Sequence, residues 1–436
     1  MMDKKIKDKK IVIVGAGVSG IAAAKLCLKE GAKKVRLVDK NEKLSKNEEI
    51  LKLKDVGVEV RFGEHKKEDF EDAELVVLSP GVKKEKIVSM VPKGALIISE
   101  IELGFWFLDE PIIGVTGTNG KTTTASLIAH VLKKRFKVFL GGNIGTPLCS
   151  YLLSDKKADI LVLELSSFQL ENIHHFKPHV SLFLNFSSNH LDFHKDEEEY
   201  FMAKLKIFIN QDHNDYAILE KPLLEKVLKR IKLPSKIITF DGKRKFNSSL
   251  LGEHNQKNME AAYLACSIFG ISEDEFNKSL KGFRPHPHRL DVFLKKDGVL
   301  FVDDSKATTL AATEAAIKSF DNKIILLAGG RFKGGDPFKL NDILSKKVKK
   351  LILFGECREI FYEAWKNVVD TIKVFSLKDA VDVAVKEAKP GDVVLLSPGT
   401  SSFDEFRDYK ERGLFFQKRV KEILNVIDNE GFEKEI

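Results

Sequence analysis

Residues 111–123 of this 436-residue chain read PIIGVTGTNGKTT. The run PIIGV is typical of a buried β-strand, and the following GKTTTASLIAHVLKK is typical of a helix. A Gly-rich loop between strand and helix can cradle phosphates with its backbone N–H groups, while Lys121 can reach the β and γ phosphates and the Thr122 hydroxyl can hold Mg²⁺. Val115 stands where the strict pattern GxxxxGK[ST] has glycine, but the shorter pattern is still specific. The residues predicted to bind ATP here are Gly117, Thr118, Asn119, Gly120, Lys121, Thr122 and Thr123.

The same strand, loop and helix order repeats along the chain. Apolar, β-branched runs such as IVIVG (11–15), DILVLELS (159–166) and DVVLLSPG (392–399) alternate with helical stretches. Such runs fit parallel strands buried on both faces, so the predicted class is α/β. Motifs at 15–20, 117–122 and 303–308 each open a unit. We therefore predict three domains: a Rossmann-like domain over 1–99, a P-loop ATPase-like domain over 100–291 and a second Rossmann-like domain over 292–436.

Composition narrows the class of protein. The length corresponds to about three domains at roughly 150 residues each, and 43% hydrophobic with 31% charged residues is a globular balance. No run approaches the ~20 apolar residues that cross a bilayer. The net charge of +8 is spread along the chain without basic clusters interleaved with aromatics, which argues against nucleic acid and favours anionic ligands. Four cysteines without CxxC spacing indicate a reducing cytoplasm.

The N-terminal motif GAGVSG (15–20) is less decisive. It follows a strand and opens a helix, and Asp39 ends the next strand 19 residues later, which is the spacing of a dinucleotide fingerprint. The same backbone approach serves any nucleotide diphosphate, including a UDP-sugar, so an oxidoreductase and a UDP-binding domain both stay open. Ser79 and Gly81, after the third strand, could line the same crevice.

Further motifs carry a resemblance over the whole chain. GNIG (142–145), ELSSFQL (164–170), NHLDFH (189–194), DSKAT (304–308) and SSFD (401–404) follow TGTNGKTT in order. Together they resemble the Mur ligase family, which forms amide bonds with ATP in bacterial wall synthesis. The combination of GxGxSG, HLDxH, DSKAT and SFDxF is most similar to members that join D-glutamate to UDP-N-acetylmuramoyl-L-alanine.

The resemblance implies a mechanism and its catalytic residues. ATP would phosphorylate a carboxylate, and an amine would attack the acyl phosphate through a tetrahedral intermediate, releasing ADP and phosphate. The implied catalytic residues are Lys121, Glu164, His190 and Lys204, and the implied ligands of two Mg²⁺ ions are Thr122, Glu164, His190 and Lys204 with its amine carbamylated. A salt-bridged strand-end acid, a loop histidine and a solvated lysine are the alternatives for Glu164, His190 and Lys204, and His194 is a second histidine candidate.

The resemblance also assigns the remaining binding residues. For adenine and ribose they are Asn255, Asn258, Arg289 and Asp304, although Asn255 could cap a helix instead. For the UDP substrate they are Val18, Ser19, Asp39, Lys40, Ser79, Gly81 and Asn143, with Asn41 near the phosphates. For D-glutamate they are Lys306, Thr308, Lys333, Ser402 and Tyr409. Thr309, Gly399-Thr400 and Arg331-Phe332 depart from the family pattern, so the amino-acid pocket could be altered.

Rival functions remain at this level. They are another Mur-type ligase, a folylpolyglutamate synthase relative, or a nucleotide-binding oxidoreductase or sensor. The intact Lys121 and Glu164 argue against a degenerate P-loop. We expect a cytoplasmic monomer that acts on small molecules, binds neither nucleic acid nor membrane, and closes its C-terminal domain during catalysis.

Overall fold

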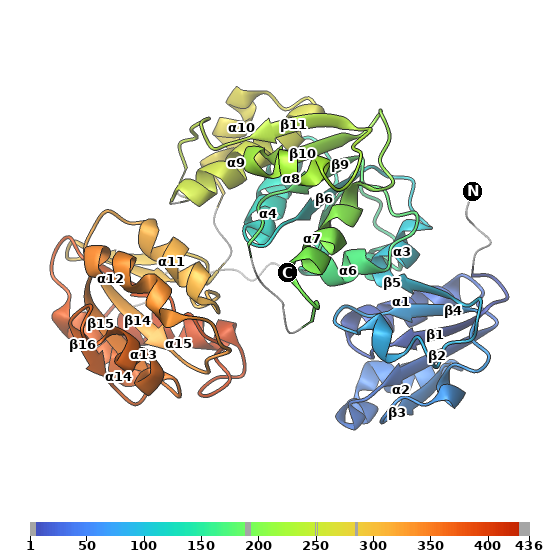
Figure 1. Cartoon of the computed structure of the whole chain (residues 1–436), viewed down its shortest axis with the longest axis horizontal. Helices are drawn as coiled ribbons and strands as arrows, with labels where there is room; N and C mark the ends of the chain where they lie inside the picture. The colour runs from blue at the N-terminus through green and yellow to red at the C-terminus, as the bar shows by residue number, and fades with distance from the viewer. Residues whose placement is uncertain (1–5, 188–192, 249, 251, 284–286, 427–436) are drawn as a thin grey trace. The chain divides into compact units, whose positions relative to one another are not determined.

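A computed structural model describes residues 6–187, 193–248, 250, 252–283 and 287–426. Contacts within the chain define two compact units, Met1–Asn247 with Gln256–Phe283, and Ser248–Asn255 with Arg284–Ile436. The described residues form three separate sheets flanked by helices (Figure 1). The predicted α/β class is confirmed, while the boundaries at 99 and 291 stay predictions.

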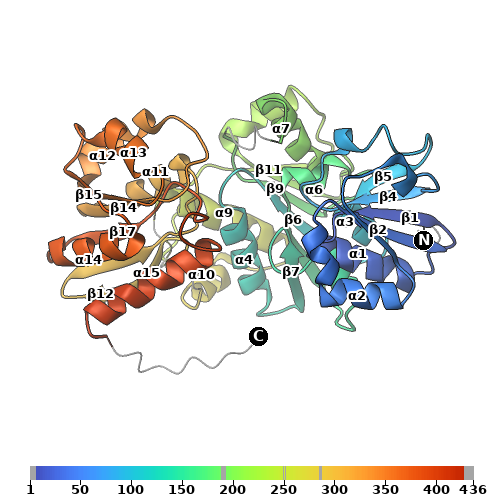
Figure 2. The ribbon, with the colours of Figure 1, turned by 90° about the horizontal axis from the view of Figure 1, so that it is seen from below.

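The first sheet has the strand order β3-β2-β1-β4-β5, and every pairing in it is parallel. Along β1, Ile11 and Ile13 enter one core cluster while Val12 and Val14 enter another, because successive side chains point to opposite faces. Helix α1 packs beside α2 along this sheet (Figure 2). The elements are β1 (Lys10–Val14), α1 (Val18–Lys29), β2 (Lys34–Asp39), η1 (Glu42–Lys46), α2 (Glu48–Asp55), β3 (Glu59–Phe62), η2 (Lys67–Asp69), β4 (Leu75–Leu78), η3 (Lys84–Lys86) and β5 (Leu96–Ser99).

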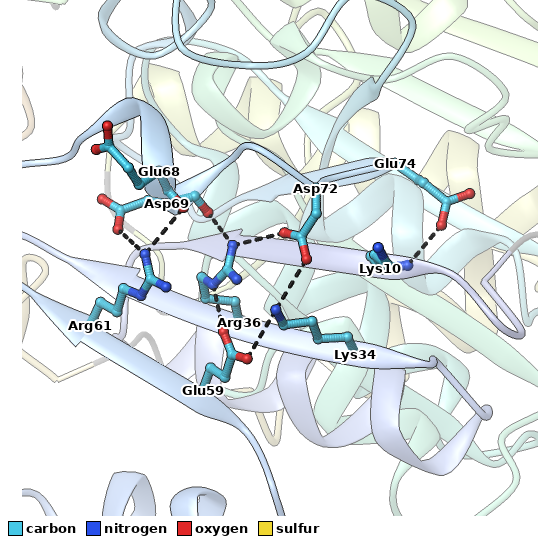
Figure 3. A network of polar contacts seen from close by, with 9 residues as sticks. All are labelled: Lys10, Lys34, Arg36, Glu59, Arg61, Glu68, Asp69, Asp72 and Glu74. Carbon is cyan, nitrogen blue, oxygen red and sulfur yellow. Dashed lines mark hydrogen bonds and ion pairs between the residues drawn. The ribbon is translucent and has the colours of Figure 1, made fainter.

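A buried arginine ties the strands of this sheet together (Figure 3). Arg36 on β2 lies 2.8 Å from the Glu59 carboxylate and 3.0 Å from that of Asp72, and it donates to the backbone oxygen of Asp69 at 2.8 Å. Lys34 bridges the same two acids at 3.0 Å each. Because the Arg36 guanidinium is buried, its several acceptors are what make its desolvation tolerable.

The second sheet has the order β11-β10-β9-β6-β8-β7 and is also parallel throughout. Central strands β6, β8 and β9 are buried at every residue, which explains why their sequences are mainly apolar. The elements are α3 (Glu100–Phe105), β6 (Ile112–Thr116), α4 (Lys121–Leu132), β7 (Val138–Gly142), α5 (Leu148–Leu152), β8 (Ile160–Glu164), α6 (Ser167–Glu171), β9 (Val180–Phe183), α7 (Glu197–Leu205), η4 (Lys206–Phe208), β10 (Tyr216–Glu220), η5 (Lys221–Leu223), α8 (Leu224–Leu228), β11 (Lys236–Phe240), α9 (Glu253–Ile268) and α10 (Glu273–Leu280).

Helix α3 joins the first two sheets. The Glu102 carboxylate accepts backbone N–H groups from His174, His175 and Phe176 at 2.8–3.0 Å. Its neighbour Glu100 accepts the backbone N–H of Cys149 at 2.7 Å. These charge-assisted bonds fix α3 against α5 and the chain before β9, so the first two sheets belong to one compact unit.

The third sheet has the order β12-β13-β17-β14-β15-β16, with β12 antiparallel at the edge and the other pairs parallel. Helices α11, α12 and α13 cover one face and α14 with α15 covers the other (Figure 2). The elements are β12 (Asp291–Lys296), β13 (Val299–Asp303), α11 (Leu310–Lys318), β14 (Ile324–Gly329), η6 (Pro337–Leu340), α12 (Asn341–Lys347), β15 (Val348–Phe354), α13 (Arg358–Trp365), β16 (Thr371–Lys373), α14 (Leu377–Glu387), β17 (Val393–Leu396) and α15 (Tyr409–Ile423). None of the helices in the described ranges is long and apolar enough to cross a membrane.

Candidate active site

The loop after β6 has the conformation that its sequence predicts. Gly117 and Gly120 have φ of 150° and 80°, and a Cβ at position 120 would overlap the Asn258 amide. The Lys121 ammonium donates to the carbonyls of Gly117 at 2.9 Å and Thr118 at 3.0 Å, so it curls back over the loop. Helix α4 begins at Lys121 and directs its N-terminal N–H groups to the same place. This geometry suits an anionic phosphate.

A buried carboxylate lies beside the loop. Glu164, at the end of β8, is 3% exposed. Its Oε2 accepts the Thr122 hydroxyl at 2.7 Å, and its Oε1 accepts the Asn143 amide at 2.9 Å. A hydroxyl, a carboxylate and an amide oxygen are the hard donors that Mg²⁺ prefers, so this group fits a magnesium ion. Asn143, assigned from sequence to the UDP substrate, therefore also belongs to the surroundings of Glu164.

Lys204 is a buried side chain in the last turn of α7. It is 1% exposed, its ammonium donates to the Gly117 carbonyl at 3.0 Å, and it lies 4.5 Å from the centre of the Tyr200 ring. Burial and the nearby charge of Lys121 lower the pKa of Lys204 well below its usual value, whereas Glu164 acts in the opposite direction. The structure thus excludes a solvated lysine, and burial favours the neutral form of its amine.

Two residues near the loop were not singled out from the sequence. The Asn185 side chain accepts the backbone N–H of Asn119 at 2.8 Å and donates to its carbonyl at 3.1 Å, holding the loop from the end of β9. Tyr200 reaches the Thr118 hydroxyl at 3.4 Å. Its spacing of four residues before Lys204 places both on one helix face, which was the available sequence signal.

His190 and its neighbours 188–192 lie outside the described residues. The alternative histidine, His194, is described: it is buried, and its Nε2 lies 2.9 Å from the Ser167 hydroxyl. Thr123 is half-buried in the first turn of α4.

The conformation of the N-terminal turn explains why glycine is needed at positions 15 and 20. Gly15 has φ of 101°, and a Cβ at Gly20 would overlap the Gly15 carbonyl. At Gly17 a Cβ would meet nothing within 4 Å, so the backbone faces open space there. Asp39 holds the turn by accepting the Ala16 N–H at 2.6 Å.

The other UDP-assigned residues surround that turn. Val18 is 72% exposed at the start of α1, beside the half-buried Ser19. The Ser79 hydroxyl donates to the Gly15 carbonyl at 3.0 Å, and Gly81 is exposed two residues later. Lys40 is exposed and pairs with Glu64 at 2.6 Å.

The third sheet brings part of the predicted D-glutamate set together. The Lys306 ammonium lies 5.0 Å from the centre of the Tyr409 ring, and the Ser305 hydroxyl donates to the Tyr409 carbonyl at 2.8 Å. Ser402 is buried, and Thr308 is half-buried. Lys333 is exposed and lies 5.8 Å from the centre of the Phe403 ring.

Arg412 organises these loops and was not singled out from the sequence. It is fully buried and donates to the Ser305 hydroxyl at 2.9 Å, the Ser305 carbonyl at 2.8 Å and the Thr400 carbonyl at 3.0 Å. The loops that carry Lys306 and Ser402 are therefore fixed from beneath. Its helix carries many other charged residues, so the sequence does not distinguish Arg412 from a solvent-exposed arginine.

The residues predicted for adenine and ribose have different settings. Asn255 and Asn258 are buried on α9. Asp304 is buried in the third sheet, accepting the Ser397 hydroxyl at 2.9 Å and the Leu290 N–H at 3.2 Å. Burial raises the pKa of Asp304 to about 7, although the Arg289 charge lowers it.

The three β-sheets are each flanked by helices, and the phosphate loop lies beside the buried side chains of Lys204 and Glu164. These features define a nucleoside-triphosphate-dependent enzyme of the α/β class. Family models match at residues 9–99 (Mur ligase MurD-like, N-terminal domain), 115–245 (Mur ligase middle domain) and 288–399 (Mur ligase, glutamate ligase domain). The chain belongs to the Mur ligase family.

Curated relatives match nearly the whole chain. A UDP-N-acetylmuramoylalanine–D-glutamate ligase of Desulfovibrio desulfuricans is 45% identical over 414 residues, covering 94% of this chain and 95% of the relative. One from Lawsonia intracellularis is 43% identical over 419 residues, with 95% of each covered.

Solved structures share the fold at low identity. The UDP-N-acetylmuramate-alanine ligase MurC of Thermotoga maritima is 19% identical, with a TM-score of 0.58 and coverage of 96% of this chain and 99% of that one. The MurF ligase of Thermotoga maritima in complex with ADP is 18% identical, with a TM-score of 0.59 and coverage of 97% and 96%.

Proposed function

We propose that this protein joins D-glutamate to UDP-N-acetylmuramoyl-L-alanine with ATP, releasing ADP and phosphate, in the cytoplasmic stage of peptidoglycan synthesis. The names of relatives that are 43–45% identical over most of the chain support the substrates. The observation that carries the chemistry is the buried Lys204, whose ammonium reaches the carbonyl of the phosphate loop at 3.0 Å.

The phosphate loop addresses the main obstacle of the reaction. A carboxylate and a triphosphate repel one another, so positive charge must lie where phosphoryl transfer takes place. In the proposal, the backbone N–H groups of residues 117–123 bind the phosphates, and Lys121 leaves its two loop carbonyls to neutralise the β and γ phosphates. The resulting acyl phosphate is attacked by the amine of D-glutamate through a tetrahedral intermediate.

Magnesium would supply electrophilic stabilisation of phosphate oxygens. Thr122 and Glu164 would hold one ion, and His190 with carbamylated Lys204 a second. A lysine whose pKa is depressed by burial is a nucleophile for CO₂, and the carbamate is an anionic oxygen ligand. Deprotonating Lys204 also removes a positive charge from beside Lys121, which weakens the repulsion between the two side chains.

The two remaining substrates have separate proposed sites. The turn over residues 15–20, with Val18, Ser19, Asp39, Lys40, Ser79 and Gly81, would bind the UDP end, and Asn143 would contact the muramoyl part. Lys306, Thr308, Lys333, Ser402 and Tyr409 would bind the carboxylates of D-glutamate. Asn255, Asn258, Arg289 and Asp304 would contact adenine and ribose.

The proposed division of labour follows the predicted domains. Residues 1–99 bind the UDP substrate, 100–291 bind ATP and 292–436 bind the amino acid. Lys121 belongs to one compact unit and Lys306 to the other, so the reaction requires a closed state in which both reach the reacting groups. We propose that the protein works as a cytoplasmic monomer on small molecules.

An acceptor panel tests the function. Purified protein with ATP, Mg²⁺ and each UDP-muramoyl precursor is assayed for phosphate release with D-glutamate, L-alanine, L-glutamate and diamino acids. The proposal predicts release that requires both UDP-N-acetylmuramoyl-L-alanine and D-glutamate. Release that is independent of D-glutamate, or preference for another pair, would contradict it.

A further inference from the structure

A second group of potential metal ligands lies outside the residues used above. Glu171 ends α6, His194 precedes α7, and Glu199 lies in the first turn of α7. One ligand atom from each lies within 4.8 Å of the others. We propose that Glu171, His194 and Glu199 bind a divalent transition-metal ion, with Zn²⁺ the best match. We call this group the Glu171 site.

Glu171 offers a buried carboxylate oxygen to a cation. Its Oε2 is buried and has no hydrogen-bond partner among the described residues. The Lys206 ammonium donates to the backbone carbonyl of Glu171 and not to its carboxylate. Leaving a buried acceptor without a donor is unfavourable. A bound cation would remove that cost.

The charges around Glu171 are mixed. Glu85 and Glu199 place negative charge near its carboxylate, while Lys206 and Lys84 place positive charge near it. Two carboxylates that face each other at close range favour either a shared proton or a cation between them. A metal ion fits better because an imidazole lies with them.

His194 is held as a metal-binding histidine usually is. It is 2% exposed, and its Nε2 lies 2.9 Å from the Ser167 hydroxyl. Ring centres of Phe168, Phe193 and Tyr200 lie 5.7, 5.1 and 5.3 Å from the centre of the imidazole. A hydrogen bond to one ring nitrogen fixes the ring's orientation and raises the basicity of the other.

Glu199 lies on the solvent-accessible side of the Glu171 site. It is exposed, and its Oε2 accepts the backbone N–H of Lys195. Two atoms bonded to one Zn²⁺ at roughly 2.1 Å lie at most about 4.2 Å apart, so ligands within 4.8 Å need only a small movement, which an exposed glutamate can make. Water can complete the coordination from the solvent side.

The donor set selects the metal. One imidazole nitrogen with two carboxylate oxygens suits Zn²⁺, Mn²⁺ or Co²⁺, whereas Mg²⁺ prefers oxygen ligands only. The Glu171 site shares no residue with the Thr122 and Glu164 group that fits magnesium. A bound ion would join the end of α6 to the start of α7, the helix that carries Lys204, and would stabilise the folded chain by mass action.

The test is a Zn²⁺ titration of metal-stripped full-length protein against a chromophoric chelator, with Mg²⁺ in large excess. We expect one Zn²⁺ per chain that Mg²⁺ does not displace. Glu171→Gln and Glu199→Gln should each weaken Zn²⁺ binding at least about tenfold, the lower end of what losing an outer partner alone costs. The control Glu197→Gln removes an exposed acid from the same turn of α7 and should leave the affinity unchanged.

Glu199 is exposed and its replacement by glutamine keeps the side-chain length, so this variant should fold normally. Folding is checked separately in every variant. Circular dichroism and ATP binding should match the unmodified protein in all three variants. No Zn²⁺ binding in excess Mg²⁺, equal affinity in all variants, or a loss in Glu197→Gln as large as in Glu199→Gln would each overturn the proposal.

Discussion

Replacing Lys204 separates its packing role from its proposed chemical role. Lys204→Ala removes three buried methylene groups, worth about 0.8 kcal/mol each, and a hydrogen bond to the Gly117 carbonyl worth about 1 kcal/mol. The expected loss in free energy of unfolding is therefore about 3 kcal/mol. Lys204→Met has similar length and no amine, so it should lose less stability while remaining unable to carry a carbamate.

The kcat values of Lys204→Ala and Lys204→Met should reflect the loss of the amine and not the difference in their stability. Loss of a group that stabilises charge in phosphoryl transfer costs on the order of 10²–10³ in kcat, so both variants should fall by that factor. Acetate or formate should partly restore Lys204→Ala, which has a cavity for the anion, and should not restore Lys204→Met, which fills it. Steady-state kinetics and chemical denaturation give both readouts. A Met variant with near-normal kcat, or no rescue of the Ala variant together with an unmodified Lys204 in an active crystal form, would refute the reasoning.

Three further predictions concern other parts of the molecule. Glu164→Gln should lower kcat by about 10²–10³, because a neutral amide replaces the carboxylate that accepts the Thr122 hydroxyl. Thr122→Ser keeps a hydroxyl and should stay active. If Glu164→Gln reached the kcat of the unmodified protein in a Mg²⁺ titration, this prediction would be contradicted. Gly20→Ala should raise KM for the UDP substrate more than KM for ATP, since its Cβ would overlap the Gly15 carbonyl; an unchanged KM for the UDP substrate would count against it. The ¹³C-labelled Asp304 carboxyl should titrate near pH 7 in NMR, with Asp304→Asn assigning the signal. Because the folded state holds the proton more tightly, the stability that this group contributes is lost as pH rises from about 4 to about 7. A midpoint near 4 would show an unshifted pKa and would contradict this prediction.

The repeating architecture could be predicted from the sequence because parallel strands buried on both faces are mainly apolar. The run at Ile112–Thr116 illustrates this: all five residues are buried, and its neighbours β8 and β9 read the same way. The edge strand β12 was not anticipated. It is antiparallel and largely accessible, so its sequence carries no continuous apolar run.

The phosphate loop was predictable because local sequence specifies it: glycines at positive φ, then a lysine at a helix start. The supports of the loop were not, because they come from distant elements. Asn185 reaches Asn119 of the phosphate loop across 66 positions. In the third sheet, Arg412 likewise reaches Ser305 across 107 positions and supports the loop that carries Lys306. Neither residue belongs to a local motif, so only the folded chain places them.

The buried state of Lys204 could not be inferred from its helix. The sequence EEYFMAKLKIF has charged residues on several sides, and a solvated lysine was an open alternative. The contacts of Lys204 with the Tyr200 ring and the Gly117 carbonyl show that its side chain is not solvated. Contacts between elements distant in sequence thus determine which of the lysines in α7 and its extension is chemically unusual.

The most direct test of the central claim follows oxygen atoms. If ATP phosphorylates the substrate carboxylate, UDP-N-acetylmuramoyl-L-alanine labelled with ¹⁸O in its carboxyl group must pass one ¹⁸O to each phosphate released when D-glutamate is present. Mass spectrometry of the phosphate would then show the label in proportion to product. Unlabelled phosphate alongside full amide formation would contradict the acyl-phosphate account.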